Sequence, residues 1–178
     1  DGRLHGRHPE MQSRIVSEID AVLADGVPSM ERLKSLAYTS QFIQEVLRLY
    51  PPAWTVARNA VADDEIMGYR IPAGAIVMVS PYFAHRLEEC WPDPLRFDPE
   101  RFTPEAIAAR HPFAYFPFSL GPRICIGASF ALQEAVIILA TLLSRFRFSA
   151  VPGKTPDPVM IRTLRPEGGV WLMAECLQ

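Results

Sequence analysis

The chain has 178 residues, of which 49% are hydrophobic, and this suffices for one hydrophobic core. Its formal net charge of −2 gives no sign of the basic surface that nucleic-acid binding requires, so no nucleic-acid partner is expected. The three cysteines, Cys90, Cys125 and Cys176, are an odd number, which argues against a disulfide framework and favours a reducing compartment.

Two helices are predicted in the first part of the chain. Residues 8–24 form an amphipathic pattern, and residues 36–49 form a second one that ends before two consecutive prolines. Glu45 and Arg48 lie three residues apart on the second helix and therefore project from one face. Such a pair is ordinarily a solvated ion pair worth about 0.3 kcal/mol, and the spacing alone favours this interpretation.

A small β-sheet, rather than a separate domain, is predicted over residues 55–80. The alternation from Thr55 to Asn59 suits a short strand, and Gly68 and Gly74 punctuate two β-rich runs that follow it. Arg58 lies on the first strand, either as a solvated strand arginine or as a partner for an anion.

An irregular meander is expected over residues 81–117, which are dense in proline and aromatic residues. His85 in this segment is interpreted as a structural histidine whose hydrogen bonds are satisfied. Arg101 follows Pro99 and Glu100 near the end of the meander.

The loop over residues 118–127, FSLGPRICIG, is the most informative stretch of the chain. It places Cys125 just before a long apolar helix, where unpaired amide N–H groups and the helix dipole favour the thiolate that metals bind. A single free cysteine is more often a small buried hydrophobe, so the residue alone leaves both interpretations open.

The other residues of this loop suit a planar, anionic ligand. Gly121 permits an unusual backbone conformation or a close approach, and Gly127 leaves room for a bulky planar group. Arg123 supplies a fixed positive charge for a carboxylate, and Phe118 can keep water away from the sulfur.

A long helix and a β-rich tail are predicted to follow the loop. Residues 128–145 are apolar nearly all round, which is typical of a helix inside a core. The helix is too short for a membrane span and is interrupted by Gln133 and Glu134. Residues 146–175 are predicted to form short strands and turns.

The pattern Phe-x-x-Gly-x-Arg-x-Cys-x-Gly resembles the haem-binding loop of the cytochrome P450 family, the haem-thiolate monooxygenases. With five motif positions filled, the resemblance favours Cys125 as the axial ligand of the iron in haem b. It implies that Arg123 pairs with a haem propionate and that N–H groups around Ile126 to Ala128 bond the sulfur. The cofactor-binding residues that it implies are Cys125, Arg123, Arg58, Phe118, Gly121, Ile126 and Gly127.

The resemblance extends upstream of the loop. It implies a buried structural cluster that braces the loop leading to the cysteine, formed by Glu45, Arg48 and Arg101. It also places Arg58 as a second propionate-binding arginine. The residues that would face the substrate pocket by position are Ala53, Trp54, Thr55, Val56 and, at the tip of the tail hairpin, Thr163.

The fold class that the resemblance implies is mainly α with small β-sheets (α+β), the C-terminal part of the cytochrome P450 fold. Residues 1–178 would then form a single incomplete domain. The family's long central helix, with the acid/alcohol pair that delivers protons to bound dioxygen, does not occur in this sequence. A large apolar face is therefore expected to be left bare, which favours aggregation or a molten state.

The function that the resemblance implies is monooxygenation: the intact enzyme takes two electrons and O₂, inserts one oxygen atom into an organic, apolar substrate and releases water. Electrons from NAD(P)H would arrive through a separate ferredoxin or flavoprotein reductase that docks on the proximal face. The alternatives are a non-catalytic haem-thiolate sensor or carrier, an inactive truncated fragment, and a haem-free fold around a structural cysteine. The location would be cytoplasmic in a bacterium, and a membrane anchor on an absent N-terminus stays open.

Overall fold

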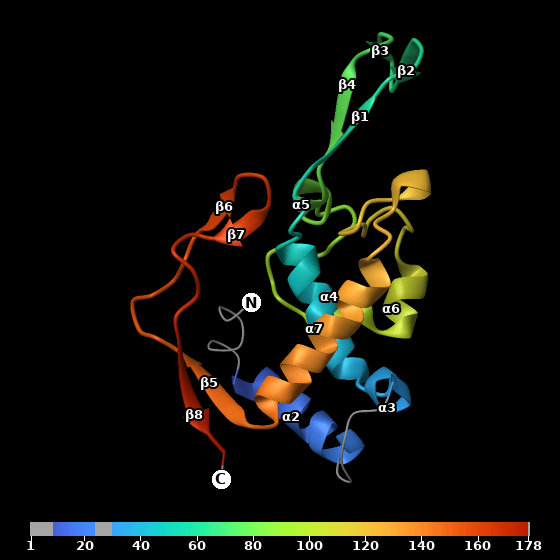
Figure 1. Ribbon diagram of the computed structural model, residues 1–178. Helices are drawn as coiled ribbons and strands as arrows, with labels where there is room; N and C mark the ends of the chain where they lie inside the picture. The colour runs from blue at the N-terminus through green and yellow to red at the C-terminus, as the bar shows by residue number, and fades with distance from the viewer. Residues whose placement is uncertain (1–8, 24–29, 178) are drawn as a thin grey trace.

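Three helices form the body of the structure, a computed structural model that describes residues 9–23 and 30–177 (Figure 1). They are α2 (Pro9–Leu23), α4 (Ala37–Leu49) and α7 (Ala128–Leu143), and the short α3 (Met30–Lys34) precedes α4. The predicted ends of the first helix, residues 8 and 24, lie outside the described residues.

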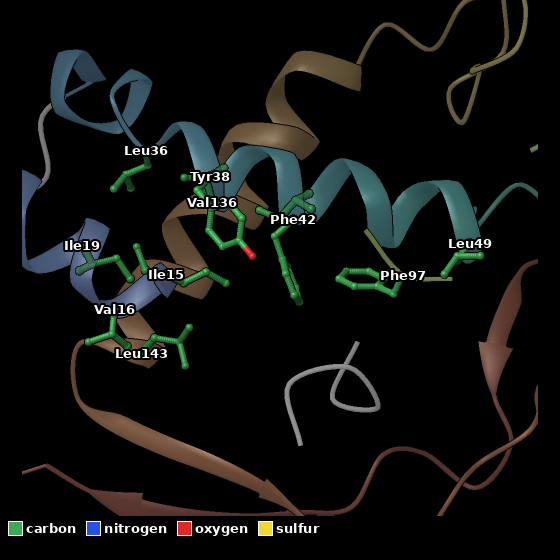
Figure 2. Close-up of a cluster of buried hydrophobic side chains, with 12 residues drawn as sticks. Ile15, Val16, Ile19, Leu36, Tyr38, Phe42, Leu49, Phe97, Val136 and Leu143 are labelled. Atoms are coloured by element: carbon green, nitrogen blue, oxygen red, sulfur yellow. The ribbon is translucent and has the colours of Figure 1, made fainter. Parts of the chain in front are cut away.

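The main core lies where α2, α4 and α7 meet, and its side chains point toward one another in Figure 2. Apolar residues recur at helical spacing on each helix, so every helix has one face that must be removed from water. The fully or nearly buried members of this core are Ile15, Val16, Ile19, Leu36, Tyr38, Phe42, Ile43, Leu49, Phe97, Val136, Ala140 and Leu143. The core therefore fixes α4 against α7, the helix that follows the cysteine.

Polar side chains of α2 bind the neighbouring elements. The Glu18 carboxylate accepts hydrogen bonds from the backbone N–H groups of Tyr38 (2.7 Å) and Thr39 (2.8 Å), and from the Thr39 hydroxyl (2.6 Å). The Gln12 amide donates to the carbonyl oxygen of Phe148 (3.1 Å) and accepts from its N–H (2.9 Å). Glu18 thus satisfies free N–H groups at the start of α4. Gln12 bonds both backbone groups of Phe148, as a neighbouring β-strand would.

In the described residues the strands form two-stranded antiparallel sheets. The pair β1 (Val56–Asn59) and β4 (Ile76–Val79) continues into the pair β2 (Asp64–Ile66) and β3 (Tyr69–Ile71), and together they form a ribbon that extends away from the helices in Figure 1. In the tail, β5 (Phe146–Ala150) pairs with β8 (Leu172–Cys176), and β6 (Pro158–Met160) pairs with β7 (Leu164–Pro166). The predicted class, mainly α with small sheets, is confirmed.

The meander is irregular but has a small core of its own. Its elements are α5 (Pro81–Ala84), the 3₁₀ turn η1 (Pro99–Phe102) and α6 (Pro104–Ala109), and each begins with a proline. Trp91, Phe102 and Ala114 are buried together, and the Arg110 guanidinium carbon lies 4.2 Å from the centre of the Trp91 ring. Aromatic and cation–π contacts therefore hold this segment in place of regular backbone pairing.

Helix α7 differs from the expectation of a helix inside a core. Val136, Ala140 and Leu143 are buried, but Phe130 is 69% exposed and Ile138 is 51% exposed. A groove of about 460 Å³, lined by apolar side chains of α4, α7, β5 and β8, lies open beside it. The prediction that α7 lies inside a core was wrong for this exposed side of the helix. The separate prediction that an apolar face is left bare is confirmed. None of the helices among the described residues is long and apolar enough to cross a membrane.

Candidate functional site

The cysteine loop, residues 118–127, is closed by its own backbone. The N–H of Cys125 donates to the carbonyl oxygen of Phe118 at 2.9 Å, and the chain between them makes a compact turn. Ser119 and Gly121 adopt left-handed φ angles of 65° and 68°. Glycine adopts this region without a steric cost, which explains Gly121, but a serine there requires another explanation.

The thiol of Cys125 is exposed to solvent at the end of this loop. A Cβ atom added to Gly127 would lie 3.8 Å from the Cys125 sulfur, so glycine keeps this side of the sulfur clear. The Ile126 side chain is fully exposed beside it. Of the N–H groups around Ile126 to Ala128 that the resemblance implies as donors to the sulfur, that of Ala128 donates to the carbonyl oxygen of Cys125 at 3.3 Å.

Two arginines lie at the cysteine loop. Arg123 is exposed on the 3₁₀ turn η2 (Gly121–Arg123) and forms no hydrogen bond or salt bridge with a described residue. Arg58, on β1, donates from Nη2 to the Ser119 hydroxyl at 3.0 Å and from Nη1 to the Ala57 carbonyl oxygen at 2.9 Å. Neither guanidinium is paired with a carboxylate in the described part of the chain, so both positive charges are open to an anionic ligand.

Glu45 and Arg48 form a fully buried, bidentate ion pair on α4. Arg48 Nε lies 2.6 Å from Glu45 Oε2, and Arg48 Nη2 lies 2.8 Å from Glu45 Oε1. The interpretation as a solvated surface pair is wrong, since both side chains are 0% exposed. Burial raises the pKa of Glu45, while the hydrogen bonds from Arg48 and from the Asp98 N–H oppose this shift.

All five N–H donors of Arg48 are used. Besides its two bonds to Glu45, Arg48 donates to the carbonyl oxygens of His85 (2.8 Å), Pro94 (2.7 Å) and Arg96 (3.1 Å). These carbonyls belong to the meander, up to 48 residues further along the chain. Arg48 therefore fastens the irregular meander to a regular helix.

Arg101 joins this cluster less closely than the resemblance implies. Its Nε lies 3.6 Å from Glu45 Oε1, which is too far for a good hydrogen bond, and this buried atom has no hydrogen-bond partner. Its Nη2 instead donates to the carbonyl oxygen of Asp93 at 2.9 Å. Arg101 thus adds positive charge beside Glu45 and holds the meander through its backbone.

His85 has the structural role that the sequence indicates. It is completely buried, and its Nε2 accepts a hydrogen bond from the Phe116 N–H at 2.9 Å. Nδ1 then carries the proton and donates to the Arg48 carbonyl oxygen at 3.1 Å. Burial, followed by the nearby charges of Arg48, Arg86 and Arg110, lowers the pKa of His85 to about 4, so the ring is neutral at physiological pH.

A continuous chain of hydrogen bonds leads from α4 to the cysteine loop. Arg48 binds His85, His85 binds the Phe116 N–H, and the Phe116 carbonyl oxygen accepts from the Ser119 N–H at 3.1 Å. Ser119 in turn binds Arg58 through its hydroxyl. The buried ion pair therefore supports the loop through His85, a connection that no local sequence pattern indicates.

The expected pocket residues lie at the junction between the ribbon and the tail. Trp54 Nε1 donates to the Ile161 carbonyl oxygen at 3.2 Å, and the Leu164 N–H donates to the Pro52 carbonyl oxygen at 2.9 Å. These two bonds flank Thr163, so the tail turn is held beside the segment after α4. Ala53 is exposed here, and Thr55 and Val56 are half-buried.

The residues of the cysteine loop fit a haem. An open thiol supplies one metal ligand, the apolar side chains of Ile124 (57% exposed) and Ile126 face solvent, and Arg123 and Arg58 offer charge for carboxylates. Haem has the matching features: an iron, a flat apolar ring and two propionates. Among the described residues, no three His, Cys, Asp or Glu side chains are placed to hold a metal ion together.

Sequence comparison agrees with this geometry. A family model described as Cytochrome P450 matches residues 6–173. A probable cytochrome P450 4aa1 of Drosophila melanogaster is 41% identical over 169 residues, which cover 93% of this chain and 33% of that protein. A cyclooctat-9-en-7-ol 5-monooxygenase of Streptomyces melanosporofaciens is 42% identical over 152 residues, covering 85% of this chain and 33% of the relative.

Secologanin synthase 1 of Catharanthus roseus is 39% identical over 172 residues, covering 93% of this chain and 32% of that protein. The chain thus spans about a third of the length of the curated relatives that it matches. With the family model covering nearly all of its residues, the chain belongs to the cytochrome P450 family.

Proposed function

We propose that this chain is the haem-ligating part of a monooxygenase, in which the Cys125 thiolate binds the iron of haem b. The observation that carries the proposal is the exposed Cys125 thiol on a closed loop that also contains Arg123 and binds Arg58 through Ser119. Neither arginine has a carboxylate partner among the described residues. When bound, haem supplies the redox-active iron that activates O₂ for insertion into an organic substrate.

The side chains around the thiol have separate tasks. Arg123 and Arg58 would neutralise the two propionates, because a guanidinium binds a carboxylate through paired N–H donors. Gly127 would leave room for the haem near the sulfur, and Phe118 would limit the access of water to it. The hydrogen-bond chain that begins at Arg48 keeps the loop in this geometry.

Substrate and electrons are proposed by analogy with the family. An organic, apolar substrate would contact the segment that contains Trp54, Thr55 and Val56, with Thr163 beside it. The name of one relative specifies a cyclic alcohol, cyclooctat-9-en-7-ol, as a substrate of that protein. Electrons from NAD(P)H would come from a ferredoxin or flavoprotein reductase that docks near the cysteine loop. The free thiols of the chain support a reducing compartment.

The proposal is tested by the absorption spectrum of the complete protein after reduction and exposure to CO. We expect a Soret band at the position typical of a thiolate ligand, and its loss in Cys125→Ala. Cys90→Ala and Cys176→Ala are matched controls, because both residues are also free thiols, and both variants should keep the band. A thiolate spectrum that persists in Cys125→Ala would refute the ligand assignment. Haem binding without oxygenated product, when an apolar organic substrate, a reductant and O₂ are all supplied, would favour a sensor or carrier.

A further inference from the structure

Ser119 is the residue of the cysteine loop that the proposed function leaves unexplained. Its φ of 65° lies in the left-handed region, which costs a residue with a Cβ atom more than it costs glycine. The loop does use glycine at its other left-handed position, Gly121. A serine therefore occupies a site where glycine would be less strained, and its hydroxyl is the feature that glycine lacks.

The Ser119 hydroxyl binds the guanidinium of Arg58. Arg58 Nη2 donates to Ser119 Oγ at 3.0 Å, and Nη1 donates to the Ala57 carbonyl oxygen at 2.9 Å. Two attachment points fix the plane of the guanidinium, and three of its five N–H donors are left over. Because Arg58 is on β1 and Ser119 is in the cysteine loop, this bond also ties the strand to the loop.

The charge of Arg58 is held without being neutralised. Both of its acceptors are neutral oxygens, and no salt bridge joins Arg58 to a carboxylate within the described residues. Two other exposed arginines are paired with carboxylates: Arg14 with Glu100 at 2.5 Å and Arg70 with Asp63 at 2.8 Å. Arg58 is thus placed and oriented while its charge stays open to an anion.

We propose that Ser119 is a positioning residue, whose hydroxyl holds the Arg58 guanidinium at the rim of the cysteine loop so that it binds one haem propionate. This inference rests on the proposed haem-binding function. A free arginine side chain loses much rotamer freedom when it binds, and fixing it beforehand removes part of that cost from haem binding. The hydrogen bond to a neutral hydroxyl achieves this without competing for the charge.

Three substitutions at position 119 separate the hydroxyl from the backbone. Ser119→Ala keeps the left-handed strain and removes the oxygen, whereas Ser119→Gly relieves the strain and removes the oxygen. Ser119→Asn tolerates the left-handed region and restores an acceptor oxygen. In haemin titrations of the complete apoprotein, we expect Ser119→Ala and Ser119→Gly to bind haem roughly threefold to tenfold more weakly, and Ser119→Asn to recover most of the affinity.

A double-mutant cycle with Arg58→Met tests whether Ser119 acts through Arg58. If it does, Ser119→Ala weakens haem binding in the wild-type background and causes no further loss when Arg58 is already replaced. The reduction potential of the haem iron gives a second measurement that a purely structural role would not change. It should fall in Ser119→Ala, because the positive charge is no longer held near the propionate, and Ser119→Asn should restore it.

The possible outcomes distinguish this inference from the proposed function. One contrary result is that Ser119→Gly binds haem as tightly as wild type, with a loss of haem affinity only in Ser119→Ala. Because the glycine variant also lacks the hydroxyl, this result would show that residue 119 matters for the turn alone, and it would overturn the positioning role. Equal losses from Ser119→Ala with and without Arg58 would overturn it as well. If the wild-type protein binds no haem through Cys125, the proposed function itself fails, and the Cys125→Ala spectrum detects this separately.

Discussion

Replacing Arg48 by lysine should destabilise the fold strongly, although it preserves the charge. Arg48 satisfies five acceptors with five N–H donors: two oxygens of Glu45 and the carbonyl oxygens of His85, Pro94 and Arg96. Lysine has three donors, so at least two buried acceptors lose their partner. At about 1–3 kcal/mol for each buried group, the loss is about 2–6 kcal/mol.

This magnitude is large compared with the stability of an ordinary domain, which is about 5–15 kcal/mol. Arg48→Met should be worse than Arg48→Lys, because it removes the bidentate partner of the buried Glu45 carboxylate and leaves only the more distant charge of Arg101 beside it. Breaking a buried ion pair in this way costs about 3–5 kcal/mol. Urea unfolding followed by tryptophan fluorescence is a suitable assay, since the Arg48 guanidinium carbon lies 5.0 Å from the buried Trp91 ring.

The matched control is Arg70→Lys on the ribbon. Arg70 Nη2 lies 2.8 Å from Asp63 Oδ2, a distance similar to those in the buried pair, but the two side chains are 78% and 58% exposed. Water solvates both partners, so the urea midpoint should stay at the wild-type value. The reasoning would be refuted if Arg48→Lys unfolded at the same urea concentration as wild type, or if the two lysine variants were equally destabilised.

Three further predictions concern stability. The unfolded chain binds a proton at His85 near pH 6.5 and the folded chain only near pH 4, so this histidine stabilises the fold above pH 6.5 and loses about 3 kcal/mol of that effect as the pH falls to 4. Urea unfolding across this range should therefore show a steeper pH dependence in wild type than in His85→Gln, and equal slopes would contradict the assignment. Glu18→Ala should lower the free energy of unfolding by about 1–2 kcal/mol, because Thr39 and its neighbour lose their acceptor at the start of α4; an unchanged melting temperature would exclude this role. Gln12→Ala should cost about 1–3 kcal/mol by leaving the Phe148 N–H unpaired, and a urea midpoint equal to that of wild type would show that water replaces the side chain.

Local patterns in the sequence were sufficient for the three long helices and the cysteine loop, but not for the short helices α3, α5 and α6. The apolar run of residues 128–145 predicts α7, which spans Ala128–Leu143. The apolar periodicity of residues 8–24 and 36–49 predicts α2 and α4, and the alternation near Arg58 predicts β1. These elements depend on the 3.6-residue and 2-residue periods of neighbouring side chains, which a sequence displays directly. The motif around Cys125 indicates its chemistry for the same reason, because all of its parts lie within one loop.

Contacts between distant segments could not be predicted from such patterns. The carbonyl oxygens that Arg48 binds lie 37 to 48 residues away, and any residue type supplies a carbonyl. The bond between Arg58 and Ser119 spans 61 residues, and nothing near Ser119 marks it as left-handed. The exposed face of α7 was missed for a related reason: an apolar run shows which residues are apolar, but their burial depends on what packs against them.

The most direct test of the central claim is X-ray absorption at the iron edge of the purified holoprotein, which identifies the atoms bonded to iron. We predict one sulfur ligand in the wild-type protein, its replacement by a lighter atom in Cys125→Ser, and an unchanged sulfur signal in Cys90→Ser. An iron without a sulfur ligand in the wild type, or with one that persists in Cys125→Ser, would contradict the assignment of Cys125 as the haem ligand.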